Sequence, residues 1–145
     1  MNNKPGSTAA DWGLLILRLT LAAVFIAHGA QKLFGAFDGP GLGGVVQMLG
    51  PVGYLVSIGE FFGGIGLLVG ILPRFSAAAL AVIMVGAIVK VHLAKGFFMA
   101  GGGYEFALSL LGLSIALAIM GPGRFSISEH VSLKQLFGKR ELATG

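Results

Sequence analysis

Four apolar runs, each about as long as a bilayer is thick, constrain this chain more than any other feature of its sequence. They lie at about 13–34, 52–72, 75–94 and 104–121. A helix needs about 20 mainly apolar residues to cross the ~30 Å hydrocarbon core of a membrane. Because 55% of the residues are hydrophobic and only 11% are charged, a water-soluble fold would leave much apolar surface exposed. The sequence therefore predicts an all-α integral membrane protein built as a four-helix bundle.

Glycine, proline and basic residues predict where the runs end and how they are oriented. The breaks lie at Gly39 to Gly53, Leu72-Pro73-Arg74, Gly96 to Gly103, and Gly121-Pro122-Gly123. Membrane proteins carry an excess of Lys and Arg in their cytoplasmic segments. Lys32, Lys90 and Lys95 lie near one side, whereas the larger basic set shares the other: Lys4, Arg74, Arg124, Lys134, Lys139 and Arg140. We therefore expect both termini to be cytoplasmic.

The domain organisation expected from this pattern is one membrane domain, residues 1–126, followed by a tail, residues 127–145. The tail mixes apolar and basic residues, which fits either an amphipathic helix on anionic lipid or a disordered segment. The net charge of +4 is explained by membrane topology, so we expect lipid as a partner and no nucleic acid. The segment Gly39 to Gly44 matches G-x-G-x-x-G, but it follows an apolar span and is interpreted as a loop.

The absence of cysteine narrows the possible chemistry. With no thiol, the chain has no disulfide, no cysteine nucleophile and no cysteine-bound iron–sulfur cluster. We also expect no protein-bound metal site. Any function must therefore use the few polar side chains of the membrane domain or be supplied by a partner.

Ionisable residues within or beside the predicted spans are the candidates for function. An ionisable side chain near the bilayer centre costs about 3 kcal/mol or more unless it is paired or hydrated. The first and third spans end on the outer side, and the second and fourth begin there. Their polar residues are therefore expected to form one layer, which predicts an outward-facing polar pocket inside the membrane.

The residues expected in this pocket come from all four spans. His28, Gln31 and Lys32 share one helix face, because they follow the spacing i, i+3 and i+4. Glu60 lies six residues beyond Tyr54, about 9 Å deeper at ~1.5 Å per residue. We predict Glu60 and His28 as the catalytic pair, because a buried acid beside an imidazole suits a proton relay or a ligand anchor. The candidate ligand-binding residues are Gln31, Lys32, Lys90, His92 and Glu105.

A purely structural role competes with this interpretation for several of these residues. In this role the polar groups pair with one another or extend to the interface: Lys32 and Lys95 are long enough to reach lipid headgroups, and Glu105 lies near enough to the interface to stay hydrated. For these three residues the structural role is favoured. For Lys90 and His92 the two roles are evenly balanced.

Small residues in the second span predict close helix packing. A glycine stripe with a spacing of three to four residues lets a neighbouring backbone approach, and packing within the bundle is favoured over a homo-oligomer interface. Arg18, in the first span, is likewise assigned a structural role. The glycines of the stripe are Gly59, Gly63, Gly66 and Gly70.

With these residues in view, the chain resembles the DoxX family of small bacterial four-helix membrane proteins. The resemblance covers roughly residues 13–126. It depends on the order and spacing of several short motifs: Leu17-Arg18-Leu19, His28-Gly29-x-x-Lys32-Leu33-Phe34-Gly35, Glu60-x-x-Gly63-Gly64, His92 before Gly96-Phe97-Phe98, and Gly121-Pro122-Gly123-Arg124. It implies a location in the bacterial cytoplasmic membrane.

The resemblance also implies a link to quinones. Some relatives are described as subunits of a terminal quinol oxidase or of a thiosulfate:quinone oxidoreductase, and others as membrane anchors of oxidoreductase assemblies. Carried over, this implies a quinone-headgroup or proton site at His28, Lys32, Glu60, His92 and Glu105. A complete terminal oxidase is excluded, because the chain offers only three imidazoles for haem or metal. Haem held between His28 and His92 is a minor alternative.

Three functional hypotheses follow from the sequence. The leading one is a non-autonomous subunit of a quinone-linked redox system, which binds a quinone or similar apolar molecule and exchanges electrons or protons with a partner oxidoreductase. The second is a non-catalytic anchor or assembly factor for a soluble oxidoreductase. The third is a small transporter. Whether the chain itself is an enzyme is left open at this stage.

Overall fold

The computed structural model describes residues 8–130. Its helical elements, in chain order, are α1 (Thr8–Phe34), the 3-10 turn η1 (Ala36–Asp38), α2 (Gly41–Leu49), α3 (Val52–Val69), α4 (Pro73–Ala87), the π-helical turn η2 (Ile88–His92), the 3-10 turns η3 (Leu93–Lys95) and η4 (Met99–Gly101), α5 (Glu105–Met120) and α6 (Ile127–His130). This part of the chain contains no β-strand, so the predicted all-α class is confirmed. The predicted tail beyond His130 lies outside the described residues.

The long helices differ in whether they can cross a membrane alone. Three are long and apolar enough: α1, α3, and the continuous helix Pro73–Lys95, of which α4 is the first part. Helix α5 is equally apolar but has 16 residues, about 24 Å at ~1.5 Å per residue, against ~30 Å of hydrocarbon. Three of the predicted spans thus meet the requirement, and the fourth stays a prediction.

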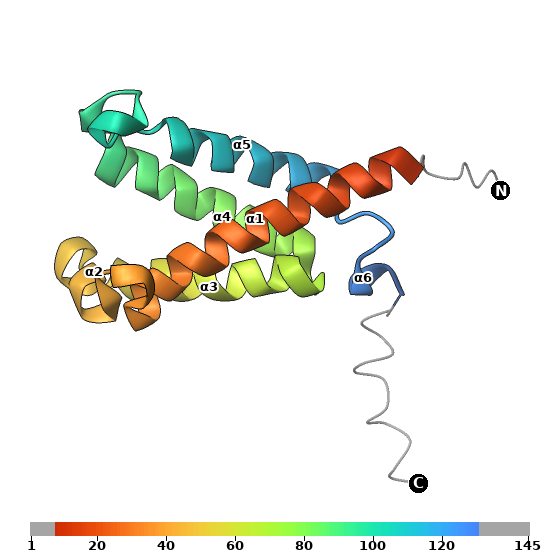
Figure 1. The fold of residues 1–145 in the computed structure, drawn as a ribbon, viewed down its shortest axis with the longest axis horizontal. Coiled ribbons are helices and arrows are strands. Elements are labelled where there is room, and N and C mark those ends of the chain that lie inside the picture. Colours follow the sequence, from red (N-terminus) through yellow and green to blue (C-terminus); the bar gives the residue numbers. More distant parts are fainter. Residues whose placement is uncertain (1–7, 131–145) are drawn as a thin grey trace, which may run out of the picture.

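The helices run back and forth between two ends of the molecule. One end, which we call the α6 end, holds the start of α1, the α3–α4 connection at 70–72, and residues 121–130 with α6 (Figure 1). The other, the α2 end, holds α2 and residues 88–104 with η2 to η4. The most extensive contacts join α1 to α3 and α4 to α5. Residues far apart in sequence therefore meet at the α2 end.

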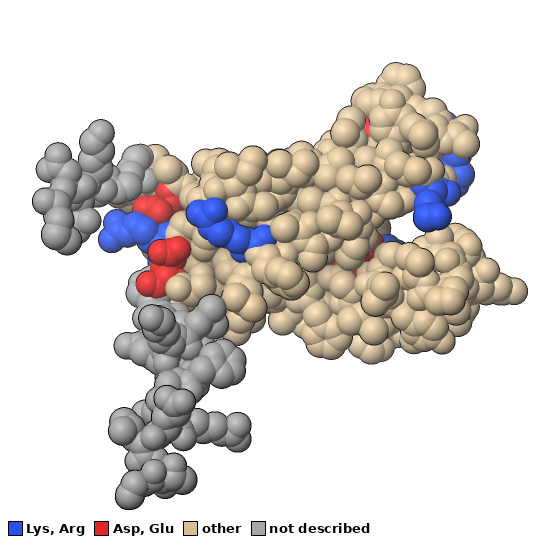
Figure 2. All heavy atoms as spheres, turned by 180° about the vertical axis from the view of Figure 1, so that it is seen from behind, with Lys and Arg blue, Asp and Glu red and all other residues tan. Residues whose placement is uncertain are grey.

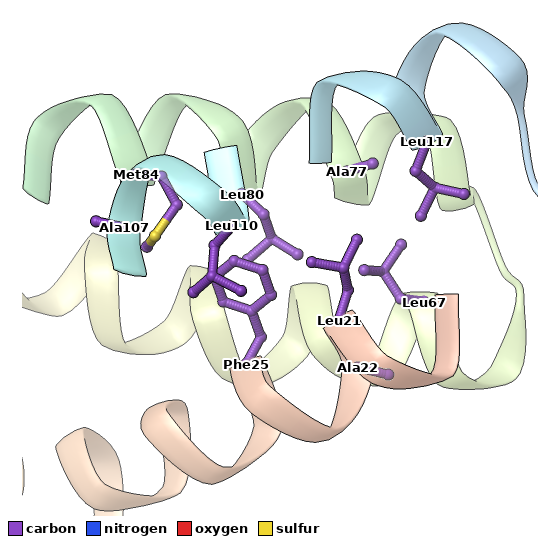
Figure 3. Close-up of a cluster of buried hydrophobic side chains, with 10 residues drawn as sticks. All are labelled: Leu21, Ala22, Phe25, Leu67, Ala77, Leu80, Met84, Ala107, Leu110 and Leu117. Atoms are coloured by element: carbon purple, nitrogen blue, oxygen red, sulfur yellow. The ribbon is translucent and has the colours of Figure 1, made fainter. Parts of the chain in front are cut away.

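A single apolar core joins four of the helices. Phe25 and Leu21 of α1 are almost fully buried and point toward Leu80 of α4 and Leu110 of α5 (Figure 3). The remaining members also come from these helices and from α3: Ala22, Leu67, Ala77, Met84, Ala107 and Leu117. Burying an aliphatic or aromatic side chain of this kind in a protein core lets it make tens of favourable contacts.

Charged side chains avoid the middle of the molecule. Figure 2 shows Lys, Arg, Asp and Glu gathered toward the two ends, with a broad uncharged belt between them on the face shown. Large apolar side chains on α1, α3, α4 and α5 are exposed, such as Ile16, Phe62, Val82 and Ile119. An apolar surface of this kind between charged ends is what a bilayer requires.

The tight connection at the α6 end is built by backbone capping. Helix α3 ends at Gly70, whose φ of 77° is the left-handed conformation, and the N–H groups of Gly70 and Ile71 both donate to the carbonyl of Gly66. Pro73 then starts α4. The guanidinium of Arg74 donates to the carbonyls at the end of α5, those of Ala118, Ile119 and Met120. These bonds satisfy carbonyls that a helix end leaves without partners.

The glycine-rich stretch from 39 to 53 differs from the sequence prediction. It was interpreted as a loop, but the structure has helix α2 at Gly41–Leu49. Pro40 precedes this helix and Gly50, with a φ of 68°, ends it. Val45 is buried, and its carbonyl lies against Gly53 at the start of α3. Burial of one apolar face thus outweighs the ~1 kcal/mol of helix propensity that each glycine costs.

Two glycines allow α1 and α3 to cross at very short range. A Cβ atom added at Gly29 would lie 2.5 Å from the backbone of Phe61, and one at Gly64 would lie 2.9 Å from the backbone N of Ile26. Both distances are shorter than van der Waals contact. The stripe glycines of α3 instead approach α4: added Cβ atoms at Gly59 and Gly66 would meet side chains there at 2.6 and 2.4 Å.

We predict that Gly29→Ala destabilises the protein by about 1–3 kcal/mol, because the added methyl group overlaps rigid backbone of α3. Gly13→Ala on the same helix is the matched control, since its Cβ would meet nothing within 4 Å. The control is expected to be neutral or to gain up to ~1 kcal/mol of helix propensity. Thermal unfolding in detergent micelles measures both. Equal midpoints for the two variants would show that the close crossing is not a constraint.

Candidate functional site

An ion pair between α1 and α3 lies at the centre of the α2 end. Glu60 of α3 is only 1% exposed. The ammonium nitrogen of Lys32, in the last turn of α1, lies 2.5 Å from each carboxylate oxygen of Glu60. The Lys32 side chain is 27% exposed, so the pair is buried on the carboxylate side and partly open on the ammonium side. Lys32 therefore pairs with Glu60 instead of extending to the lipid headgroups.

A small cavity adjoins this ion pair. Its volume is about 180 Å³, and its polar lining consists of Lys32, Glu60, His28 and His92. The rest of the wall is apolar or small: Phe25, Met84, Ala87, Met99, Gly102, Gly103, Phe106, Ala107 and Leu110. The structure thus brings together side chains from α1, α3 and η2 that the sequence predicted to share one layer.

The π-helical turn η2 supplies His92. A π-helical turn widens the helix by one residue and often marks a functional site. Nδ1 of His92 lies 2.7 Å from the carbonyl oxygen of Gly102. A carbonyl oxygen only accepts hydrogen bonds, so Nδ1 carries a proton. In the neutral ring, Nε2 is then the acceptor that His92 can offer to a ligand.

His28 lines the cavity without pairing to Glu60. Its ring packs against Phe106 of α5, with 5.9 Å between the ring centroids. The expected acid–imidazole pair therefore takes a different form, because both carboxylate oxygens of Glu60 bind Lys32. The signal for this arrangement was present in the sequence: Lys32 lies one helical turn after His28 and carries the charge opposite to Glu60.

The other candidate residues lie around the cavity rather than in it. The backbone N–H of Met99 donates to Oε1 of Glu105, so this carboxylate fixes the loop that covers the cavity. Gln31 packs against Gly39, and Lys90 lines a second, larger cavity. Neither Gln31 nor Glu105 lines either cavity.

The second cavity is an apolar groove that the sequence did not reveal. Its volume is about 510 Å³ and it lies between α2, α3 and α4. Figure 2 shows an opening at the α2 end with basic side chains at its edge. Sequence reasoning missed the groove because one wall is α2, which had been interpreted as a loop. The residues that form it are Lys32, Pro40, Val45, Met48, Leu49, Val52, Leu55, Val56, Glu60, Val82, Ile83, Gly86, Ala87, Lys90, Val91 and His92.

Polar groups at the α6 end hold the chain segments together. The buried guanidinium of Arg18 donates to the carbonyl of Phe125, 2.9 Å away, and Asp11 accepts a hydrogen bond from the backbone of Arg124. The hydroxyl of Ser126 donates to the carbonyl of Gly70. These contacts agree with the structural role assigned to Arg18. Between residues 8 and 130, no cluster of three or more His, Asp or Glu residues could hold a metal ion.

The architecture and the site define an all-helical polytopic membrane protein with a polar chamber at one end. The sequence model of the DoxX family matches residues 13–93. The chain is also 31% identical over 111 residues to the protein of Bacillus subtilis (strain 168) named "Putative oxidoreductase CatD", an alignment that covers 72% of this chain and 78% of that relative. No solved structure matches the chain significantly.

The chain therefore belongs to the DoxX family, as its motifs predicted. Family membership and the three helices that are long and apolar enough to cross a bilayer make it a multi-pass protein of the bacterial cytoplasmic membrane. This confirms the predicted location.

We predict that Lys32 and Glu60 are energetically coupled. Lys32→Met and Glu60→Gln are each expected to destabilise the protein by about 2 kcal/mol or more, because each leaves a buried partner uncompensated. The double variant should lose clearly less than the sum of the two single losses. Thermal unfolding of all four proteins measures the cycle, with Lys95→Met, outside both cavities, as a control. Simple additivity would contradict the pairing.

Proposed function

We propose that this protein is a membrane subunit of a quinone-linked redox system and that the small cavity holds the quinone headgroup. The observation that carries the proposal is a buried Lys32–Glu60 pair that shares a cavity with His28 and His92. A buried charge pair is costly, and in membrane segments such residues mark ligand or proton sites. The name of the Bacillus relative, which describes an oxidoreductase, supports the same class of function.

The cavity fits a quinone headgroup in size and chemistry. At about 180 Å³ it is smaller than the ~300–1,000 Å³ of pockets that enclose whole drug-sized ligands, so it suits one ring. A quinone is a flat apolar ring with oxygens at opposite edges. The lining matches it, with apolar side chains such as Phe25 and Met84 and a few polar groups at the margin.

Three side chains have distinct roles in this proposal. Lys32 donates a hydrogen bond to a ring oxygen, as a cationic donor on the partly open side of its ion pair. Glu60 holds the ammonium in position and compensates its charge. Nε2 of His92 accepts the hydrogen bond of one ring hydroxyl and takes that proton when a quinol is oxidised, while the second proton passes from the hydroxyl beside Lys32 to the carboxylate of Glu60. His28 forms part of the wall.

The electrons require a partner. A bound quinone supplies two-electron, two-proton chemistry, and the chain has no cysteine with which to bind an iron–sulfur cluster. We therefore propose that electrons pass to or from an oxidoreductase subunit of the same assembly. The chain is then a non-autonomous part of an enzyme.

We also propose that α5 is a fourth span and that both termini face the cytoplasm. Helix α5 packs along α4, and its ends lie near the two ends of the molecule (Figure 1). The α6 end holds Arg74 and Arg124, which the sequence analysis assigned to the side with the larger basic set, and we therefore assign this end to the cytoplasm. The headgroup cavity then opens toward the outer side of the membrane.

The quinone proposal predicts that Lys32→Met weakens quinone binding by about tenfold, the ~1.4 kcal/mol expected for one lost charge-assisted hydrogen bond. Binding is measured on purified protein by titration with a quinone, with the ultraviolet quinone-minus-quinol difference spectrum as the readout. Lys95→Met is the matched control and is expected to bind like the wild type. A wild-type protein that shows no saturable binding would overturn the proposal.

The topology predicts opposite labelling of two single-cysteine variants, which the cysteine-free chain makes straightforward. Ser128→Cys in α6 is expected to be protected from a membrane-impermeant thiol reagent in intact cells. Lys95→Cys in η3 is expected to react. The reverse pattern would place the termini outside. Reaction of both residues from one side would exclude an odd number of spans between them and so contradict α5 as a span.

A further inference from the structure

The polar cavity and the apolar groove are neighbouring compartments with a common wall. Four residues line both of them: Lys32, Glu60, Ala87 and His92. The ion pair and His92 thus form the boundary between a small polar space and a much larger apolar one. A molecule with a polar head in the first compartment has the second directly beside it.

The groove is open on the side that faces the bilayer. Met48, Leu55 and Val82 belong to its lining and are 70%, 73% and 72% exposed. These residues lie on α2, α3 and α4 respectively, so the opening runs between α2 and the two longer helices. The ionisable groups of the groove are Lys32, Glu60, Lys90 and His92, of which all but Lys90 belong to the common wall.

We propose that the groove is the binding site for the isoprenoid tail of the quinone and the lateral entrance through which the molecule reaches the cavity from the membrane. The inference rests on the proposed function and adds a second subsite to it. The small cavity is large enough only for a headgroup. Because the groove shares four lining residues with this cavity, it is the adjacent space in which the rest of the same molecule can lie.

Helix α2 has a specific role in this arrangement. Its residues Val45, Met48 and Leu49 form one wall of the groove, and without this helix the tail would lie directly against lipid. Pro40 and Gly50 bound the helix, and Gly35, Gly41 and Gly50 adopt positive φ values, so the α1–α2 and α2–α3 connections are sharp turns. Helix α2 therefore covers the site as a compact unit.

Gly86 of α4 gives a direct test of the tail subsite. It lines the groove, and a Cβ atom added there would meet nothing within 4 Å. A leucine at this position would extend into the groove without displacing backbone. Gly112 of α5 is the matched control, because its Cβ would also meet nothing within 4 Å and it lines neither cavity.

The experiment compares two quinones with the same headgroup, one without a tail and one with a decyl tail, on purified wild-type, Gly86→Leu and Gly112→Leu proteins. Affinities are calculated from the concentration of ligand in the detergent phase, so that the partition of the tail into micelles does not contribute to the difference between the two quinones. The wild type and Gly112→Leu are expected to bind the decyl form about tenfold more tightly, because the tail gains packing contacts with the groove walls that detergent chains do not provide. Gly86→Leu should lose that preference and keep its tail-less affinity.

Each outcome bears on one of the two proposals. An unchanged decyl preference in Gly86→Leu overturns the tail subsite and leaves the headgroup cavity intact. Failure of the wild type to bind either quinone overturns both. An unchanged affinity of Gly86→Leu for the tail-less quinone shows that this variant is folded. If Gly86→Leu does not fold, Gly86→Ala replaces it and is expected to reduce the preference for the decyl quinone partially. An unreduced preference in Gly86→Ala contradicts the inference. Phospholipid that co-purifies with the wild type and competes equally with both quinones would show that the groove holds lipid instead.

Discussion

The ion pair between Lys32 and Glu60 depends on how closely α1 and α3 cross. Gly29 lies one turn before Lys32, and its missing side chain lets the backbone of Phe61, the neighbour of Glu60, approach α1 directly. At this separation the ammonium group contacts both carboxylate oxygens. The backbone contact and the charge pair therefore support each other, since the glycine provides the distance and the pair compensates a carboxylate that would otherwise be buried alone.

The small cavity beside the ion pair exists because part of its wall consists of small residues. This part of the wall is formed by Ala87, Gly102, Gly103 and Ala107, which cannot fill the space. The π-helical turn directs His92 to that wall, and its bond to Gly102 joins the end of the Pro73–Lys95 helix to the loop before α5. Large side chains of the core, such as Phe25 and Leu110, close the cavity on the side of the α6 end. The open space is thus confined to the end where the polar residues lie.

Sequence reasoning reached the parts of this structure that depend on hydropathy and helical spacing. It predicted the all-α class, four spans, of which three meet the length requirement, and a common layer for His28, Lys32, Glu60 and His92, because these follow from run length and alternating direction. It did not predict α2, since glycine content suggested a loop, whereas burial of Val45 against α3 favours a helix. It left pairing and snorkelling open for Lys32, because the choice between them depends on an interhelical distance that a single sequence does not contain. The π-helical turn and the groove depend on tertiary packing in the same way.

The two ends of the molecule use their cations differently, and this difference agrees with the proposed place of the site at the α2 end. At the α6 end, Arg18 and Arg74 donate to backbone carbonyls, and Arg124 lies beside Asp11. A guanidinium suits this purpose, because its planar fork satisfies several acceptors at once. At the α2 end the cations that line the cavities are lysines, Lys32 and Lys90. An ammonium is a compact charge on a flexible stem, which can turn from one acceptor to another when a ligand enters. The arginines thus hold the α6 end together, and the lysine that pairs with Glu60 is the kind of cation that the proposed ligand site requires.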